Sequence, residues 1–129
     1  LEFKLEHFVN HLGYVSHEVA LQEQRCSQVL LLIEIDSEQT NCIIPGKLFE
    51  YLVSERPILA IGPEKADFAS IIKETNTGTF FTYEDKDALK SQIVQYFEAF
   101  QSQSLQVHAV GLQKYSRRAL TQELVAILN

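Results

Sequence analysis

The sequence contains no methionine, no tryptophan and only two cysteines among its 129 residues. Cys26 and Cys42 do not have the spacing of a metal site, so free thiols in a reducing compartment are the simpler interpretation, although a disulfide stays open. No apolar run approaches the roughly 18 residues that a membrane-spanning helix requires. The sequence therefore predicts a protein without a membrane span, and nothing in it points to secretion.

Positive charge is also scarce. The chain has 11 Lys and Arg against 17 Asp and Glu, which gives a formal net charge of −6. Its basic residues are scattered, and the one close pair, Arg117 and Arg118, falls in a late helix. Because proteins that bind nucleic acids usually present a basic patch or stripe, no nucleic-acid partner is expected.

The absence of methionine extends to the first residue, which is Leu1. An intact gene product begins with methionine unless it is processed, so we expect residues 1–129 to be a piece of a longer protein. The hydrophobic fraction of 46% is ordinary for a soluble globular domain, and the length suffices for one domain with a core.

Hydrophobic periodicity predicts alternating strands and helices along the chain. The predicted strands are 8–15, 28–35, 58–61 and 79–83, and the predicted helices are 17–25, 45–52, 64–75, one that begins at Asp85 or Asp87, and 112–128. The apolar run at 28–35 is typical of a strand buried in a parallel sheet. The alternation indicates an α/β, Rossmann-like domain, with a parallel sheet of about four strands and helices on both faces.

The segment 45–52 is the most informative part of the chain. Pro45 suits the first position of a helix, because its missing N–H has no partner within a helix anyway. Gly46, Lys47 and Leu48 would then present N–H groups that the helix does not use, and Gly46 would let a ligand approach the backbone. The sequence therefore predicts an anion site at this helix start.

Glu50 lies three residues after Lys47, so both side chains fall on one face of the predicted helix. A carboxylate only accepts hydrogen bonds, which suits the two vicinal hydroxyls of a ribose, and Lys47 would supply positive charge to a diphosphate. The alternative is an ordinary Lys–Glu contact on a solvated helix surface. The spacing alone leaves both interpretations open.

Ligands of open α/β sheets bind beyond the carboxyl ends of the strands. The loops that qualify are 13–17, 36–46 and 62–65. His17 would line the same cleft as the 45–52 helix, or it is a surface histidine near a helix start. The spacing of the early histidines fits no common zinc site, so no metal is expected. The sequence carries no Walker phosphate loop and no nucleophile elbow, and its catalytic residues are unknown.

Several segments in order carry a resemblance to a known family. They are Gly13-Tyr14-Val15-Ser16-His17-Glu18, the run 29–32, the segment Pro45-Gly46-Lys47-Leu48-Phe49-Glu50-Tyr51-Leu52, and 56–60. Together they resemble the C-terminal domain of a GT-B glycosyltransferase, of the large retaining family (group 1, or family 4) that uses nucleotide-sugar donors. The similarity extends over nearly the whole chain, and the 45–60 region is its most specific part.

The resemblance implies that residues 1–129 form one Rossmann-like domain, the C-terminal half of a GT-B fold. It implies that the parent transfers a hexose from a nucleotide diphosphate sugar to a glycan or related acceptor, with no cofactor and no metal. The donor-binding residues would be Pro45, Gly46, Lys47, Leu48 and Glu50, joined by Tyr14, Ser16 and His17. The parent would be cytoplasmic, with peripheral membrane association as a further possibility, and the fragment alone would be inactive.

Two further implications concern the rest of the family pattern. Glu50 matches the second glutamate of the family's Glu-x7-Glu motif, which binds the donor ribose, but the first position is Cys42. The final helix, within 107–129, would pack on an N-terminal domain that holds the acceptor. The donor base, the sugar, the acceptor and the oligomeric state are not indicated by the sequence.

The rival interpretation is a non-catalytic α/β interaction or regulatory module. Cys42 in place of a carboxylate favours a relative that binds without catalysing. A receiver-type signalling domain would need a cluster of acidic residues after its first strand, which is not found, and a hydrolase would need a nucleophile constellation.

Overall fold

A computed structural model describes residues 3–128. Its helices are α1 (His17–Cys26), α2 (Lys47–Leu52), α3 (Asp67–Thr75), α4 (Lys86–Gln101) and α5 (Arg117–Leu128). Its strands are β1 (Leu30–Ile33), β2 (Ile58–Ile61) and β3 (Gly78–Phe81), and its 3-10 turns are η1 (Glu6–Phe8), η2 (Glu38–Thr40) and η3 (Leu112–Tyr115).

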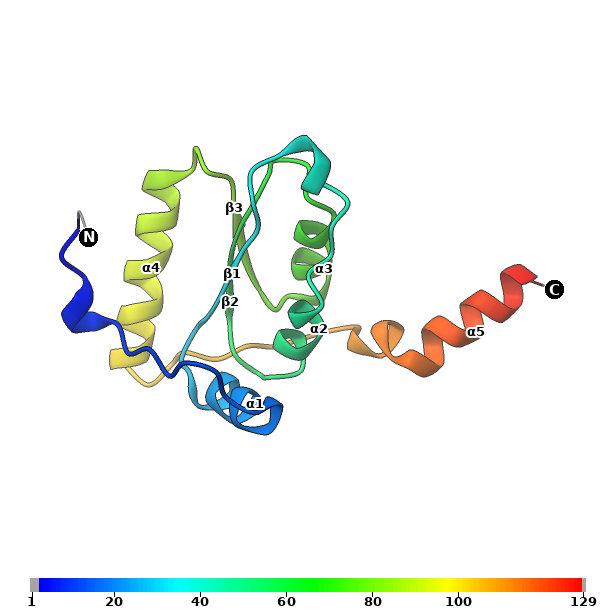
Figure 1. The fold of residues 1–129 in the computed structure, drawn as a ribbon, viewed down its shortest axis with the longest axis horizontal. Helices are drawn as coiled ribbons and strands as arrows, with labels where there is room; N and C mark the ends of the chain where they lie inside the picture. The colour runs from blue at the N-terminus through cyan, green and yellow to red at the C-terminus, as the bar shows by residue number, and fades with distance from the viewer. Residues whose placement is uncertain (1–2, 129) are drawn as a thin grey trace.

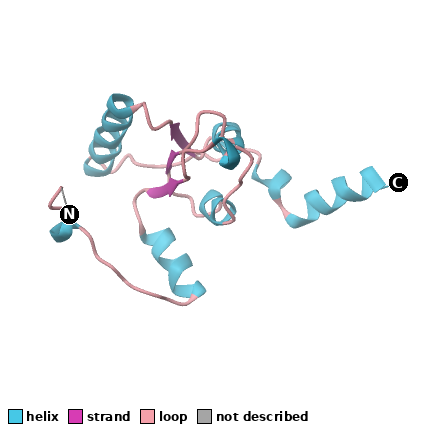
Figure 2. Cartoon of the chain, turned by 45° about the horizontal axis from the view of Figure 1, so that its top comes forward, coloured by secondary structure: helices cyan, strands magenta, loops and turns pink. Residues whose placement is uncertain are grey.

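The strands form a parallel sheet in the order β1-β2-β3. Figures 1 and 2 show α2 and α3 on one face of the sheet and α4 on the other. The predicted α/β fold, with a parallel sheet and helices on both faces, is therefore confirmed. The sheet has three strands between residues 3 and 128, one fewer than expected.

The missing strand is the one predicted at 8–15. That segment follows η1 without joining the sheet, and all of its residues except Val15 are exposed. A strand is stabilised by backbone hydrogen bonds to a neighbouring strand, and this segment pairs with none in the described chain. The prediction of a strand at 8–15 was wrong because local hydrophobicity does not supply a partner.

The core lies between the sheet and the α2–α3 layer. Its most enclosed side chains are less than 2% exposed and include Phe68, Leu32, Leu48, Ile58 and Ile72. Each such side chain contributes roughly 1.5–3 kcal/mol through burial. Phe68 packs edge-to-face on Phe80, with ring centroids 5.6 Å apart. This core fixes α2, the helix of the candidate site, against the sheet.

β1 is buried on one face only, although the sequence predicted a strand buried on both. Leu30 and Leu32 are 5% and 0% exposed, whereas Leu31 and Ile33 are 51% and 50% exposed. β1 pairs only with β2 in the described sheet, so it is an edge strand, and its second face is half exposed.

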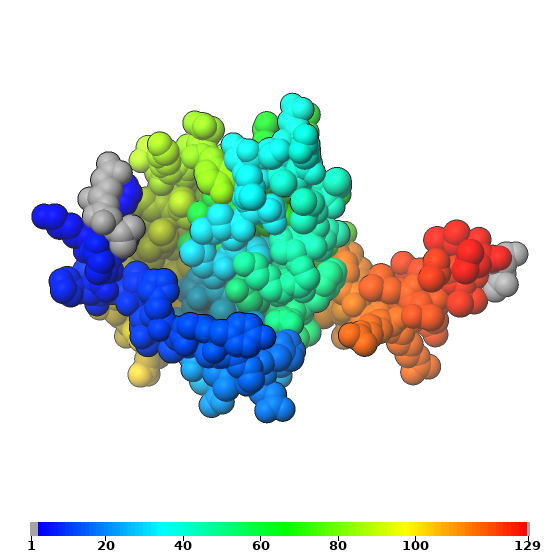
Figure 3. All heavy atoms as spheres, in the orientation of Figure 1, coloured from blue at the N-terminus to red at the C-terminus, as the bar shows by residue number. Residues whose placement is uncertain are grey.

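The end of the chain departs from the predicted single helix over 112–128. Ser116 is extended, with φ −68° and ψ 147°, and separates η3 from α5. Its hydroxyl oxygen accepts a hydrogen bond from the Ala119 N–H at 3.2 Å, so Ser116 caps the start of α5. Figures 1 and 3 show α5 projecting away from the body of the domain.

A polar clamp holds η3 against α3. The Glu74 carboxylate accepts hydrogen bonds from the Lys114 ammonium and from the Tyr115 hydroxyl, the latter at 2.8 Å. The hydrogen bond from Lys114, followed by that from Tyr115, lowers the pKa of the Glu74 carboxyl below its usual value. Tyr115 also packs on Phe49 of α2, with ring centroids 6.1 Å apart. The point from which α5 projects is therefore tied to the core.

Candidate functional site

The helix predicted to carry the site forms, but it begins at Lys47 instead of Pro45. It also lies farther from the carboxyl ends of the strands than the sequence suggested. α2 starts at Lys47, with Gly46 before it in helical conformation, so Pro45 does not occupy the first helical position. In Figure 1, the carboxyl end of β1 lies beside the η2 loop, whereas α2 lies beside the lower part of the sheet, next to α1. The 45–52 segment is therefore not at the carboxyl edge of the sheet, where it was expected.

The predicted use of the Leu48 amide is wrong. Its N–H donates to the Pro45 carbonyl at 2.9 Å, and the Leu48 side chain is 0% exposed because it fills the core. Leu48 is thus a packing residue. Gly46 and Lys47 are both exposed, and no ion pair joins Lys47 to another residue of the range 3–128. An anion contact at this turn would depend on those two residues.

Glu50 lies at the junction of α1 and α2. Its Oε2 accepts a hydrogen bond from the side-chain amide of Gln24 at 3.1 Å, across the two helices. Its Oε1 lies 3.9 Å from Nε2 of His17, which begins α1. The side chain of Glu50 is 36% exposed and that of His17 is 69% exposed. The structure thus brings together two residues that the sequence singled out from segments far apart in the chain.

The other two residues predicted from the 13–18 segment do not join this junction through any hydrogen bond found in the described chain. The Ser16 hydroxyl oxygen caps α1 by accepting from the Val19 N–H at 3.4 Å. Tyr14 is fully exposed, so its ring is not packed against the domain. Ser16 has a structural role that any N-cap serine would have.

The charge of Glu50 affects the pKa of Tyr51, its neighbour in α2. Burial raises the pKa of the Tyr51 hydroxyl above its usual 10.0, and the negative charge of Glu50 raises it further. Tyr51 also packs against the hydrophobic core. The carboxylate is therefore held at the boundary between a packed interior and solvent.

Gln24 is a member of this cluster that sequence reasoning missed. Residues 24 and 50 are separated by 26 positions, and neither lies in a motif that pairs them. A glutamine in the middle of an amphipathic helix has no signal of its own in a single sequence. The signal that existed was its place on α1, the helix that the 13–18 segment opens.

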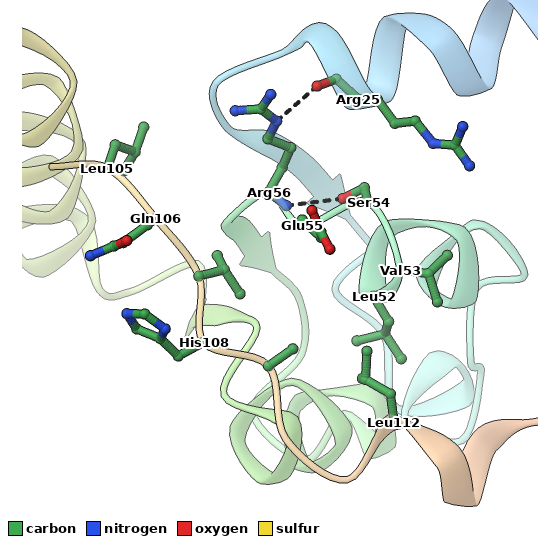
Figure 4. Close-up of a pocket in the computed structure, with 12 residues that line it drawn as sticks. Arg25, Leu52, Val53, Ser54, Glu55, Arg56, Leu105, Gln106, His108 and Leu112 are labelled. Atoms are coloured by element: carbon green, nitrogen blue, oxygen red, sulfur yellow. Dashed lines mark hydrogen bonds between the residues drawn. The ribbon is translucent and has the colours of Figure 1, made fainter. Parts of the chain in front are cut away.

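A cleft of about 1070 Å³ lies away from this junction, between the α2–β2 connection and the segment before η3 (Figure 4). Arg56 donates through Nε to the Arg25 carbonyl at 2.8 Å, and its backbone N–H donates to the Ser54 hydroxyl at 3.2 Å. Figure 4 shows the guanidinium groups of Arg25 and Arg56 directed away from each other, with His108 on the opposite wall. These cationic groups do not converge on one position, so the cleft offers no assembled anion site.

Within the described part of the chain, no three His, Cys, Asp or Glu side chains gather as a metal ion would require. Cys26 and Cys42 are exposed and unpaired there. None of the helices in that range is both long enough and apolar enough to cross a membrane. No family model matches the chain, and neither a curated protein nor a solved structure matches it.

Proposed function

We propose that this chain is the donor-nucleotide-binding domain of a GT-B glycosyltransferase. The observation that supports the proposal most is the approach of His17 to Glu50 at 3.9 Å. The resemblance to the family is carried by the 13–18 and 45–52 segments, and this approach joins those two segments. A chance likeness in sequence would not require them to be neighbours in the fold.

The proposed roles follow from the chemistry of each group. Glu50 accepts hydrogen bonds from the ribose hydroxyls, and His17, 3.9 Å from Glu50, lies beside the ribose. The exposed backbone at Gly46 approaches the diphosphate, and the ammonium of Lys47, which forms no ion pair within residues 3–128, contributes positive charge to it. In the parent enzyme, positive charge and amide donors near the diphosphate would stabilise it as the leaving group when the hexose is transferred.

Cys42 is exposed and stands where the family has its first glutamate. A thiol is a weak hydrogen-bond partner compared with a carboxylate, so other residues must hold the sugar in an active parent. The acceptor would bind to a separate N-terminal domain. The half-exposed leucines of α5, Leu120 at 45% and Leu124 at 55%, would supply the surface that packs on it. We place the parent in the cytoplasm, with membrane association at most peripheral, and expect the isolated domain to be inactive.

Titration with nucleotides tests the proposal. UDP, GDP and their glucose and mannose conjugates are added separately to the ¹⁵N-labelled chain, and binding is followed by NMR and calorimetry. We expect the nucleotides of one base, uracil or guanine, to bind. Glu50→Ala should weaken that binding by about tenfold or more, as is usual for a lost hydrogen bond to a charged group. The matched control is Glu98→Ala, at an exposed position on α4.

Two outcomes would count against the proposal in different ways. If no nucleotide binds to the folded wild-type chain, the domain does not bind a nucleotide donor. If a nucleotide binds equally well to wild type and Glu50→Ala, the donor domain stands but Glu50 does not contact the ribose.

The second candidate is a binding module without catalysis, which the thiol at Cys42 favours. It would bind the same nucleotides, so the titration above does not separate it from the first candidate. An assay of hexose transfer by the full parent protein separates the two candidates. Transfer is expected from the first candidate and not from the second. Cys42→Glu in the parent would then restore activity only if the rest of the site is intact.

A further inference from the structure

Gln24 makes a contact with Glu50 that the roles above leave unexplained. The two side chains reach across the α1–α2 junction, with Gln24 Nε2 donating to Glu50 Oε2 at 3.1 Å in a partly buried environment. This is the only side-chain hydrogen bond between α1 and α2 among residues 3–128. It acts on the residue to which the ribose contact is assigned.

The carbonyl oxygen of the Gln24 amide is in an unfavourable environment. Gln24 Oε1 is buried and has no hydrogen-bond partner in the described chain. A buried carbonyl oxygen without a donor destabilises the folded state. Turning the amide over would not help, because Oε1 would then face the Glu50 carboxylate, and both groups would be acceptors. The orientation is therefore set by Glu50.

The second oxygen of Glu50 has a different environment. Oε1 faces His17, whose Nε2 is 3.9 Å away, beyond hydrogen-bond distance. Both side chains are partly exposed, Glu50 by 36% and His17 by 69%. One carboxylate oxygen thus accepts a hydrogen bond from Gln24, while no donor among residues 3–128 lies within hydrogen-bond distance of the other.

We infer that Gln24 is a positioning residue, which holds the Glu50 carboxylate by Oε2 so that Oε1 meets a hydroxyl of the ligand. The inference rests on the proposed function and deepens it, since it names the residue that prepares the ribose contact. Holding the carboxylate before binding reduces the entropy that is lost when the ligand is bound.

Gln24→Met separates this role from a structural one. Methionine has a similar length and suits a helix, so it removes the hydrogen bond and the unpaired Oε1 together. Glu50 is partly exposed, so water can take the place of the lost donor. We expect the thermal midpoint to stay unchanged or rise, and the affinity for the nucleotide that binds, UDP or GDP, to fall about fivefold to tenfold.

A double-mutant cycle gives the decisive comparison. In the Glu50→Ala background, Gln24→Met should cause no further loss of affinity, because the carboxylate that it positions is gone. Gln22→Met, at an exposed position on the same helix, is the matched control and should bind like wild type. An unchanged affinity in Gln24→Met, or an equal loss with and without Glu50, overturns the inference.

The contact between Gln24 and Glu50 can be tested separately if the proposed function fails. If neither UDP nor GDP binds to the wild-type chain, the donor-domain proposal falls. The NMR signals of the Gln24 side-chain amide then show whether Gln24 holds the Glu50 carboxylate. They should move in Glu50→Ala and stay in place in Glu98→Ala. If they do not move in Glu50→Ala, Gln24 does not hold the carboxylate.

Discussion

At the scale of single residues, the charge on Glu50 should be detectable through the pKa of its neighbour Tyr51. Burial raises the Tyr51 pKa, and Glu50 raises it further, so Glu50→Gln should lower that pKa while leaving it above 10.0. The measurement is a pH titration of the ¹³Cζ signals of labelled tyrosine. A Tyr51 titration that is identical in wild type and Glu50→Gln would show that the carboxylate is not where the structure has it.

The same shift predicts how stability depends on alkaline pH. A tyrosine whose pKa is raised in the folded state contributes stability that is complete below the unfolded value and is lost as the pH rises through the folded value. The folded chain should therefore lose stability above about pH 10. Part of that loss should disappear in Glu50→Gln.

Residue by residue, the sequence indicated side chains better than backbone groups. Glu50 and His17 were singled out by their chemistry and by their position near helix starts, and the fold places their side chains near each other, while their role in donor binding stays a prediction. The Leu48 amide was assigned wrongly, because the choice between a free N–H and one that closes a turn on Pro45 depends on where the helix begins. That boundary is set by the packing of Leu48 in the core.

At the scale of elements, the pairing of β2 with β3 depends on a glycine. A Cβ at Gly78 would lie 2.0 Å from the Ile58 carbonyl oxygen, which is backbone of the neighbouring strand and cannot move aside. We expect Gly78→Ala to destabilise the chain by about 1–3 kcal/mol or more, as overpacking does. Denaturant unfolding measures the change.

Gly46→Ala is the matched control for that substitution. Gly46 has φ −56° and nothing lies within 4 Å of its ideal Cβ, so alanine fits without strain. It should leave stability unchanged or raise it by about 0.4–1 kcal/mol. Equal destabilisation by both variants would contradict the close approach at Gly78.

Elements with local signals were predictable, and those that depend on distant partners were not. α1, α3, α4 and the three strands could be predicted because caps, turns and periodicity lie within each segment. The strand at 8–15 failed because a strand needs a neighbour that periodicity cannot supply. The break at Ser116 was missed because apolar residues on both sides of it continued a helical pattern.

At the scale of the whole molecule, one of the exposed apolar surfaces lies on α4. Ile93, Val94, Phe97 and Phe100 of α4 are each about half exposed, from 47% to 57%. Ile93, Phe97 and Phe100 border an apolar cavity of about 370 Å³ that Leu59 and Leu105 also line. Exposed patches of this kind promote association between copies.

We therefore expect the isolated chain to self-associate weakly as its concentration rises. Phe97→Gln should raise the dissociation constant by about tenfold, which corresponds to about 1.4 kcal/mol. Sedimentation equilibrium measures the change, and Gln95→Ala, at an exposed position on the same helix, is the control. A monomer at all concentrations, or an equal effect of both variants, would contradict this expectation.

The direction in which α5 projects depends on Ser116, the extended residue between η3 and α5. α5 has 12 residues and is therefore about 18 Å long. Its direction depends on the backbone torsions of Ser116, while the hydrogen bonds of Glu74 with Lys114 and Tyr115 hold the preceding turn, η3, against α3. A rotation of about 30° at Ser116 would displace the far end of α5 by about 9 Å. The direction in which α5 projects is thus set by one serine and one carboxylate, neither of which is among the residues proposed to bind a nucleotide.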